Sequence, residues 1–304
     1  MTEFSRAAVR IGWAQEDSYL LSPPSPFMRF ALLRVVPKSH VARRRTTSKS
    51  ILTVLVRSYP DQIVGYDAEF LILKNGVKFR ISDGRTNKTF QELLERPDID
   101  DMFYARYPVG AKPIQPAKNS DPGRVRFEAL FVAMYGDCNK SDVTKNLRTF
   151  NWLPKHGGGK IAITAVNGVV SALENVSREL DEIPDQFVKY LVPTGGAYNC
   201  RRIAGSRARS MHAHGAAIDI STKFADYWRW DSTDWTQPRW RNRIPIEIVR
   251  IFEKQGFIWG GYWYHFDTMH FEYRPELWPA DCKRKPAAST MQAIYTFIAV
   301  NSWH

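Results

Sequence analysis

The sequence contains no long hydrophobic run and only three cysteines among its 304 residues. Its longest apolar runs, Ile51–Val56 and Ala293–Val300, are much shorter than the ~20 residues that a membrane-spanning helix requires, so we predict no transmembrane segment. Three cysteines are too few for a disulfide scaffold, and their spacing is not that of a zinc finger. Because 44% of the residues are hydrophobic, the composition predicts a globular protein with a substantial core.

The chain has a net charge of +12, which would suit a nucleic-acid-binding protein. Most of this excess lies at the two ends: residues 1–58 carry +7 and residues 280–304 carry +2, whereas residues 59–279 carry only +3. A phosphate-binding groove would need the positive charge clustered on the folded surface. We therefore predict no nucleic-acid partner.

Changes in composition divide the chain into four regions. Residues 1–58 are basic, include a proline-rich stretch and lack sustained periodicity, which predicts a poorly ordered extension. Residues 59–155 are expected to form an N-terminal α/β region, residues 156–279 a second domain, and residues 280–304 a basic tail. The extension contains no convincing secretory signal.

Several secondary-structure elements are expected from local patterns. Asn75-Gly76 separates two segments with strand character, Ala68–Leu73 and Val77–Ile81, and predicts a β-hairpin because Asn-Gly adopts the positive φ values of a tight turn. The spacing of apolar residues, with Pro and Gly at the ends, predicts helices at 90–95, 124–135, 164–182 and 246–255.

Two short segments, Ser210–Asp219 and Asp267–Glu272, are rich in side chains that can bind a metal. Alternation of polar and apolar residues predicts strands at Ala217–Ile220 and His270–Tyr273. If these strands are antiparallel neighbours, a histidine from each segment and Asp219 could meet at one point.

Two imidazoles and one carboxylate would leave the fourth position of a tetrahedral zinc ion open to water, as in catalytic zinc sites. Zinc would lower the pKa of that water from about 15.7 towards about 7. A second carboxylate is then needed to accept the proton, and Asp267 and Glu272 are the candidates. The alternative is a pair of surface histidines without a metal.

The order and spacing of these residues resemble those of one known family. Ser-x-His-x-x-Gly-x-Ala-x-Asp at Ser210–Asp219 is followed by Trp-Gly-Gly-x-Trp at Trp259–Trp263 and by Asp-x-Met-His-Phe-Glu at Asp267–Glu272. The pattern, over roughly residues 160–279, is similar to that of the zinc peptidases typified by VanY-type D-alanyl-D-alanine carboxypeptidases and phage L-alanyl-D-glutamate endopeptidases. The resemblance implies an α+β, hedgehog-like fold, in which a small antiparallel sheet carries the zinc site and helices pack on one side.

Carried over by position, the resemblance makes His212, Asp219 and His270 the ligands of one zinc ion. An acidic residue three positions before the last ligand is the general base of the endopeptidase-like branch, which here implies Asp267. Residues three apart on a strand face opposite ways, so a turn must separate Asp267 from His270. Glu272, which would share a face with His270, is our second choice for the base.

The resemblance also implies residues that bind the substrate. An arginine upstream of the first motif binds the substrate carbonyl or carboxylate, which favours Arg201, with Arg202 as the alternative. Ser210 supports the site or shapes the turn before the strand, and Trp263, together with Trp259, is expected to shape the floor of the cleft. The tryptophan cluster between Trp228 and Trp263 is otherwise expected to pack a long loop onto the body.

Three further residues have no assigned role in that pattern. His214 is expected to have a structural or substrate-side role, with direct zinc ligation as the alternative. We expect His265 to be a solvated histidine and Cys200 to be a small buried hydrophobic residue.

The implied function is zinc-dependent hydrolysis of peptidoglycan stem peptides in the cell envelope or periplasm. Whether the bond cut is that of a carboxypeptidase or of an endopeptidase stays open, as does the oligomeric state. The alternative is a catalytically silent zinc-binding module of the same fold that acts in cell-wall binding.

Overall fold

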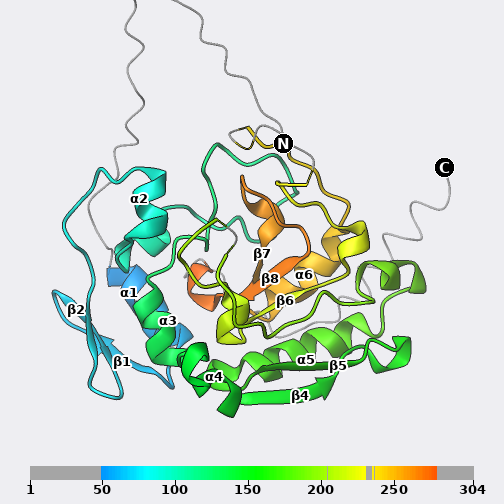
Figure 1. The fold of residues 1–304 in the computed structure, drawn as a ribbon, viewed down its shortest axis with the longest axis horizontal. Helices are drawn as coiled ribbons and strands as arrows, with labels where there is room; N and C mark the ends of the chain where they lie inside the picture. Colours follow the sequence, from blue (N-terminus) through cyan, green and yellow to red (C-terminus); the bar gives the residue numbers. More distant parts are fainter. Residues whose placement is uncertain (1–48, 204, 231–234, 236, 279–304) are drawn as a thin grey trace, which may run out of the picture. The chain divides into compact units, whose positions relative to one another are not determined.

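The computed structural model describes residues 49–203, 205–230, 235 and 237–278, which all belong to one compact unit (Figure 1). These residues form an α+β fold of short helices and small antiparallel sheets, as expected. The predicted tail at 280–304 and the first 48 residues of the predicted extension lie outside the described residues.

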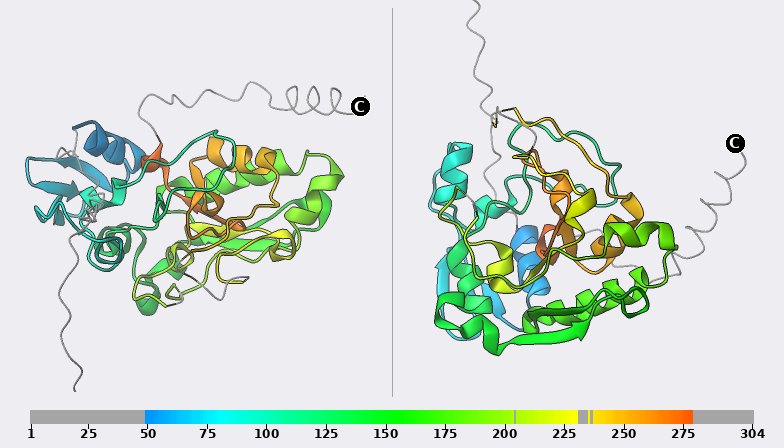
Figure 2. Two further views of the ribbon diagram at one scale, coloured as in Figure 1. Left: turned by 90° about the horizontal axis from the view of Figure 1, so that it is seen from above. Right: turned by 45° about the vertical axis from the view of Figure 1, so that its right-hand side comes forward.

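One helix, α1 (Lys49–Ser58), lies within the stretch 1–58 that we expected to be poorly ordered. Its Leu52 and Leu55 lie on one helical face and are buried, so the apolar run in this helix contributes to the core. Helix α1 contacts the 3₁₀-helix Pro275–Leu277 at the C-terminal end of the described residues (Figure 2).

The predicted hairpin is confirmed within a three-stranded sheet. Strand β2 (Phe70–Leu73) pairs with β3 (Lys78–Arg80) across the Asn75-Gly76 turn, and the unpredicted strand β1 (Ile63–Tyr66) pairs with the other edge of β2. Helix α2 (Phe90–Glu95) has the predicted bounds. Its first turn is closed by a capping box between Thr89 and Glu92.

Two predicted helices begin later than expected. Helix α3 (Glu128–Tyr135) starts four residues after the predicted beginning at 124. Helix α5 (Val169–Leu180) starts after Asn167 and Gly168, which both have positive φ and interrupt the helix that we expected from 164. Between α3 and α5 the chain forms helix α4 (Asp142–Lys145), strand β4 (Leu147–Asn151) and strand β5 (Lys160–Thr164).

The C-terminal sheet contains both predicted metal-site strands. Strand β8 (His270–Tyr273) lies between β6 (Ala217–Asp219) and β7 (Phe257–Trp259), and both pairings are antiparallel. Helix α6 (Ile246–Lys254), predicted at 246–255, packs against β7, and α5 packs against α6 (Figure 1). The rings of Phe252 on α6 and Phe271 on β8 stack with centroids 3.8 Å apart. The sheet therefore rests on a helical layer, as the resemblance implied.

Among the described helices, none has the length and apolar character needed to cross a bilayer.

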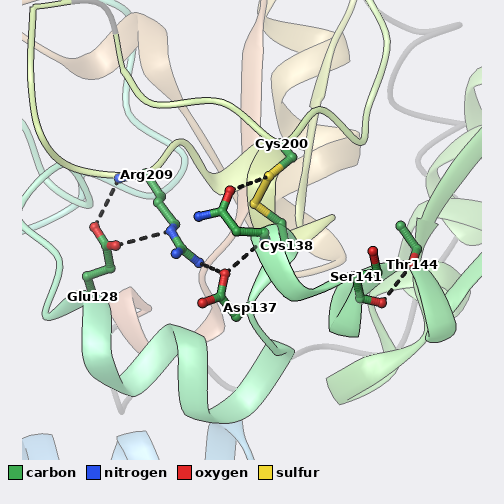
Figure 3. Close-up of a disulfide and its surroundings, with 8 residues drawn as sticks. Glu128, Asp137, Cys138, Ser141, Thr144, Cys200 and Arg209 are labelled. Atoms are coloured by element: carbon green, nitrogen blue, oxygen red, sulfur yellow. Dashed lines mark hydrogen bonds and ion pairs between the residues drawn. A yellow bond between two sulfur atoms is a disulfide. The ribbon is translucent and has the colours of Figure 1, made fainter.

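A disulfide bond joins two distant parts of the fold. Cys138, after α3, is bonded to Cys200, and their Cα atoms lie 5.7 Å apart (Figure 3). Beside it, Arg209 forms ion pairs with Glu128 and Asp137 that link the same two segments. Our expectation that Cys200 is a buried hydrophobic residue was wrong, because its pairing depends on a tertiary contact between residues 62 positions apart.

We expect loss of the disulfide to destabilise the fold. In a chain-entropy estimate, opening a loop of this length lowers the free energy of unfolding by about 4 kcal/mol. Denaturant unfolding of the double variant Cys138→Ser/Cys200→Ser should show this decrease, whereas Cys282→Ser leaves the pair intact and serves as the control. Equal midpoints for the double variant and the wild type would contradict the prediction.

A buried carboxyl group, Glu253 on α6, makes stability depend on pH. It accepts hydrogen bonds from the Tyr107 hydroxyl at 2.8 Å and from the Gly110 amide at 3.1 Å. Burial raises the pKa of Glu253 to about 7, and the hydrogen bond from Tyr107 opposes this shift only in part. The protonated carboxyl is therefore the form that the fold favours.

A pH titration of stability should reveal this group. Above pH ~4.5 the unfolded chain ionises Glu253 while the folded chain keeps it protonated, so stability falls until the folded pKa near 7 is passed. Between pH 5 and pH 8 the wild type should lose about 2 to 3 kcal/mol more than Glu253→Gln, which cannot titrate. Unfolding curves whose pH dependence is the same for both proteins would refute this expectation.

Candidate metal centre

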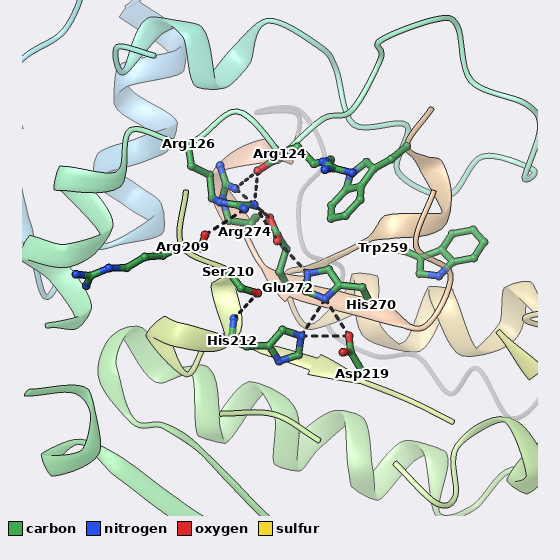
Figure 4. A network of polar contacts seen from close by, with 12 residues as sticks. Arg124, Arg126, Arg209, Ser210, His212, Asp219, Trp259, His270, Glu272 and Arg274 are labelled. Atoms are coloured by element: carbon green, nitrogen blue, oxygen red, sulfur yellow. Dashed lines mark hydrogen bonds and ion pairs between the residues drawn. The ribbon is translucent and has the colours of Figure 1, made fainter. Parts of the chain in front are cut away.

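Three side chains meet at one point beside the C-terminal sheet: His212, Asp219 and His270 (Figure 4). Asp219 Oδ1 lies 3.1 Å from His212 Nε2 and 3.0 Å from His270 Nδ1. The two imidazole nitrogens are 3.2 Å apart. Both histidines are buried, and 18% of the Asp219 side chain is exposed.

The strand register brings two of these donors together. In the antiparallel pairing of β6 with β8, Asp219 lies directly opposite His270. His212 comes from the 3₁₀-helix Met211–His214, which precedes β6, and the Ser210 side chain accepts a hydrogen bond from its amide. Gly215 then turns the chain into β6 at φ 63°, a conformation that favours glycine.

The triangle of donors fits a zinc ion. Ligands about 2.05 Å from zinc in a tetrahedral arrangement lie about 3.3 Å from one another. The observed separations of 3.0–3.2 Å are close to that value. Two imidazole nitrogens and one carboxylate oxygen are also the donor types that zinc accepts, and this set leaves one position open.

Hydrogen bonds to the other ring nitrogens orient both imidazoles. His212 Nδ1 donates to the Ala197 carbonyl at 2.5 Å, and His270 Nε2 donates to Glu272 Oε2 at 3.1 Å. These contacts leave His212 Nε2 and His270 Nδ1 as the nitrogens that face Asp219. Such partners fix the tautomer and raise the basicity of a metal-binding histidine.

Glu272 is held by charged partners in addition to His270. Its carboxylate lies 3.2 Å from Arg126 Nη1 and 3.0 Å from Arg274 Nη1 (Figure 4). Burial alone would raise its pKa, but the charge of Arg126 and the hydrogen bond with His270 lower the pKa of Glu272 to about 2. This environment favours a fixed carboxylate that orients His270 and argues against Glu272 as the proton acceptor.

Asp267 has the opposite environment. Its side chain is half-buried, and its Oδ1 is shielded from solvent without a hydrogen-bond partner among the described residues. Burial, reinforced by the negative charge of Asp219, raises the pKa of Asp267 to about 6. The His270 amide donates to the Asp267 carbonyl at 3.2 Å, so the turn that we expected between these residues is present.

Two of the donors, Asp219 and His270, border a pocket of about 270 Å³. Asp267, Arg201, Ser210 and Trp263 all line it. Arg202 is not among the lining residues, since its side chain donates to the Arg207 carbonyl. Of the two candidate arginines, the structure therefore brings Arg201 to the pocket.

Trp263 forms part of the pocket wall, and its ring lies 5.5 Å from that of His270. Trp259 does not line the pocket, which corrects our expectation for the cleft floor. It is fully buried in the core, and its indole donates to the Thr268 carbonyl at 2.8 Å.

Two other histidines lie outside the donor triangle. His214 is buried against Phe131 and Tyr135, with ring centroids 5.9 and 6.0 Å away. Burial, followed by the charges of Arg126 and Arg209, lowers the pKa of His214 to about 3. His265 was expected to be solvated, but only 15% of its side chain is exposed and its Nδ1 lies 2.5 Å from Asp121 Oδ2.

Sequence reasoning missed the charged residues that surround the site from outside the two motifs. Arg124 and Arg126 both line the pocket, although we assigned them to a helix. For Arg274 a signal was present, because polar residues alternate with apolar ones along His270-Phe271-Glu272-Tyr273-Arg274. In the structure, Arg274 is fully buried and bonded to both Glu272 and Glu276.

Comparison with known proteins supports a peptidase. Residues 204–273 match the family described as D-alanyl-D-alanine carboxypeptidase. The match includes His212, Asp219, Asp267 and His270, whereas Arg201 precedes it. No curated protein and no solved structure matches the chain significantly.

Measurements of zinc affinity should distinguish the three metal ligands from Asp267, which we do not expect to bind the metal. We expect His212→Ala, Asp219→Ala and His270→Ala each to weaken zinc binding on the order of 100-fold or more, because each removes one of three protein ligands. Asp267→Asn should bind zinc as the wild type does. Titration calorimetry of zinc into the metal-free proteins measures both effects, and wild-type affinity in any of the three alanine variants would remove that residue from the donor set.

Proposed function

We propose that this protein is a zinc-dependent peptidase that hydrolyses peptide bonds in peptidoglycan stem peptides. The observation that carries the proposal is the triangle of His212, Asp219 and His270 beside the half-buried carboxylate of Asp267, whose shielded Oδ1 has no partner among the described residues. The match of residues 204–273 to a D-alanyl-D-alanine carboxypeptidase family supports the same class of reaction.

The residues around the triangle have separate tasks in this proposal. Bound by the three donors, zinc would supply a water with a pKa near about 7 and would polarise the scissile carbonyl. Asp267 accepts the proton of the attacking water at Oδ1 and passes it to the leaving amine. Its raised pKa suits this exchange near neutral pH.

Three further residues of the pocket bind the substrate or support the site. Arg201 binds the substrate carbonyl or carboxylate, since its guanidinium stays charged and donates through a rigid fork. Ser210 supports the site through the amide of His212. Trp263 gives the pocket an apolar wall beside His270.

We place this activity in the cell envelope or periplasm. The disulfide Cys138–Cys200 supports an oxidising compartment, because disulfides persist there and are rare in the cytosol. A peptidoglycan substrate would be encountered in the same location.

Digestion of purified muropeptides by the full-length, zinc-loaded protein tests the function. Mass spectrometry should detect either loss of a single alanine, which identifies a carboxypeptidase, or cleavage within the stem, which identifies an endopeptidase. A chelator should abolish the activity and added zinc should restore it, and Asp267→Asn should lower kcat by about 10²- to 10⁴-fold.

Two outcomes would count against the proposal. Full activity in the presence of the chelator would exclude the metal mechanism. A protein that binds zinc and leaves every muropeptide intact would instead be the silent module of the same fold.

A further inference from the structure

The segment before α3 forms one wall of the pocket beside Asp267. The Tyr264 amide donates to the Ser120 carbonyl at 3.0 Å, and the Trp263 indole donates to the Pro122 carbonyl at 2.7 Å. The His265 amide donates to Asp121 Oδ1 at 3.0 Å. Residues 120–124 thus hold the loop that leads to Asp267, although they lie outside the family match.

Arg124 is fixed within this wall by three contacts. Its Nη1 donates to the His265 carbonyl at 3.1 Å, and its Nε lies 4.0 Å from Asp121 Oδ2. The guanidinium also lies 5.5 Å from the centre of the Trp263 ring. Only 15% of the side chain is exposed, so Arg124 has already lost most of its rotamer freedom before any ligand arrives.

Arg124 lines two neighbouring cavities on the protein surface. Arg124 and Ile203 line the pocket bordered by Asp219 and His270, and both also line a second hollow of about 600 Å³. Phe90, Trp228 and His265 contribute aromatic surface to this second hollow. An extended peptide that passes from the metal donors into the second hollow would therefore contact Arg124.

The charges nearby leave Arg124 able to bind an anion. Arg126, the neighbouring pocket arginine, is neutralised by Glu272 at 3.2 Å. The carboxylate closest to Arg124 is that of Asp121, which lies 4.0 Å away and is bonded to the His265 ring at 2.5 Å. Among the described residues, Arg124 Nη2 has no hydrogen-bond partner.

We propose that Arg124 binds a carboxylate of the substrate at the junction of the two hollows, so that the enzyme selects acidic peptides over their carboxamide analogues. This inference rests on the proposed function and names the substrate class of the same site. A planar guanidinium held in a partly buried position pairs with a carboxylate through two parallel hydrogen bonds, and a carboxamide cannot replace this charge.

Paired synthetic stem peptides test the inference. In each pair, the acidic peptide has a free carboxylate adjacent to the scissile bond. Its analogue has a carboxamide at that position and is otherwise identical. The wild type should prefer one acidic peptide about 10- to 100-fold in kcat/KM, mainly through KM. Arg124→Gln should abolish that preference, with a much larger loss of kcat/KM on the acidic peptide than on its carboxamide, and Arg124→Lys should be intermediate.

Controls exclude a general loss of charge or structure. Arg57→Gln removes a charge from the exposed face of α1 and should retain the wild-type preference. Arg124→Gln should retain wild-type zinc content and thermal unfolding. Equal cleavage of the two members of every pair by the wild type, or an equal loss on both members in Arg124→Gln, would overturn the inference.

Binding measurements separate this inference from the function itself. Calorimetry with the zinc-loaded protein should give a Kd for the preferred acidic peptide about 10- to 100-fold below that for its carboxamide, and Arg124→Gln should remove the difference. If the wild type cleaves no peptide, the proposed function fails, while the ratio of the two Kd values still decides the role of Arg124.

Discussion

The register between β6 and β8 is the constraint on which the site depends. It places Asp219 opposite His270, so that the carboxylate and the imidazole project from the same side of two hydrogen-bonded strands. A slip of one residue would turn one of them to the other face of the sheet. Packing on the opposite face of the sheet stabilises this register. Phe271, which lies between His270 and Glu272 on β8, stacks on Phe252 of helix α6.

A row of buried charges begins on β8 and continues into the 3₁₀-helix Pro275–Leu277. His270, Glu272, Arg274 and Glu276 are each bonded to the next, and the Tyr59 hydroxyl donates to Glu276 at 2.5 Å. Burying so many ionised groups costs free energy unless each charge is paired and hydrogen-bonded. Arg126 supplies the second cation for Glu272, so this row is balanced only with the help of residues from the N-terminal half of the chain.

Local sequence patterns were sufficient to predict strand β8, which carries His270, and helix α6, which packs beneath the sheet. The alternation in His270–Tyr273 and the apolar face of α6 gave nearly correct bounds, because both elements bury one regular face. The beginning of α5 was misplaced because apolar periodicity continues through Asn167 and Gly168, whose backbone leaves the helical region. The local pattern suggested a histidine from each motif together with Asp219, and the resemblance to the zinc peptidases singled out His212 and His270.

What the sequence could not provide were partners that depend on three-dimensional proximity. Nothing local distinguishes Arg124 from other arginines, and its place in the pocket follows from the hydrogen bonds of Asp121 to His265. The Cys138–Cys200 bond likewise depends on how α3 approaches the loop before the first motif. Glu272 was a reasonable candidate for the base until its two arginine partners were seen.

The buried row of charges limits where this protein can be truncated. A chain that began at residue 156 would retain both metal-site motifs, but it would enclose Glu272 without Arg126 and Glu276 without Tyr59. It would also lack Phe131, over whose ring the Arg274 guanidinium lies at 4.9 Å. The segment that matches the family is therefore the centre of a larger packed unit, whose buried charges are paired only when both halves of the described chain are folded together.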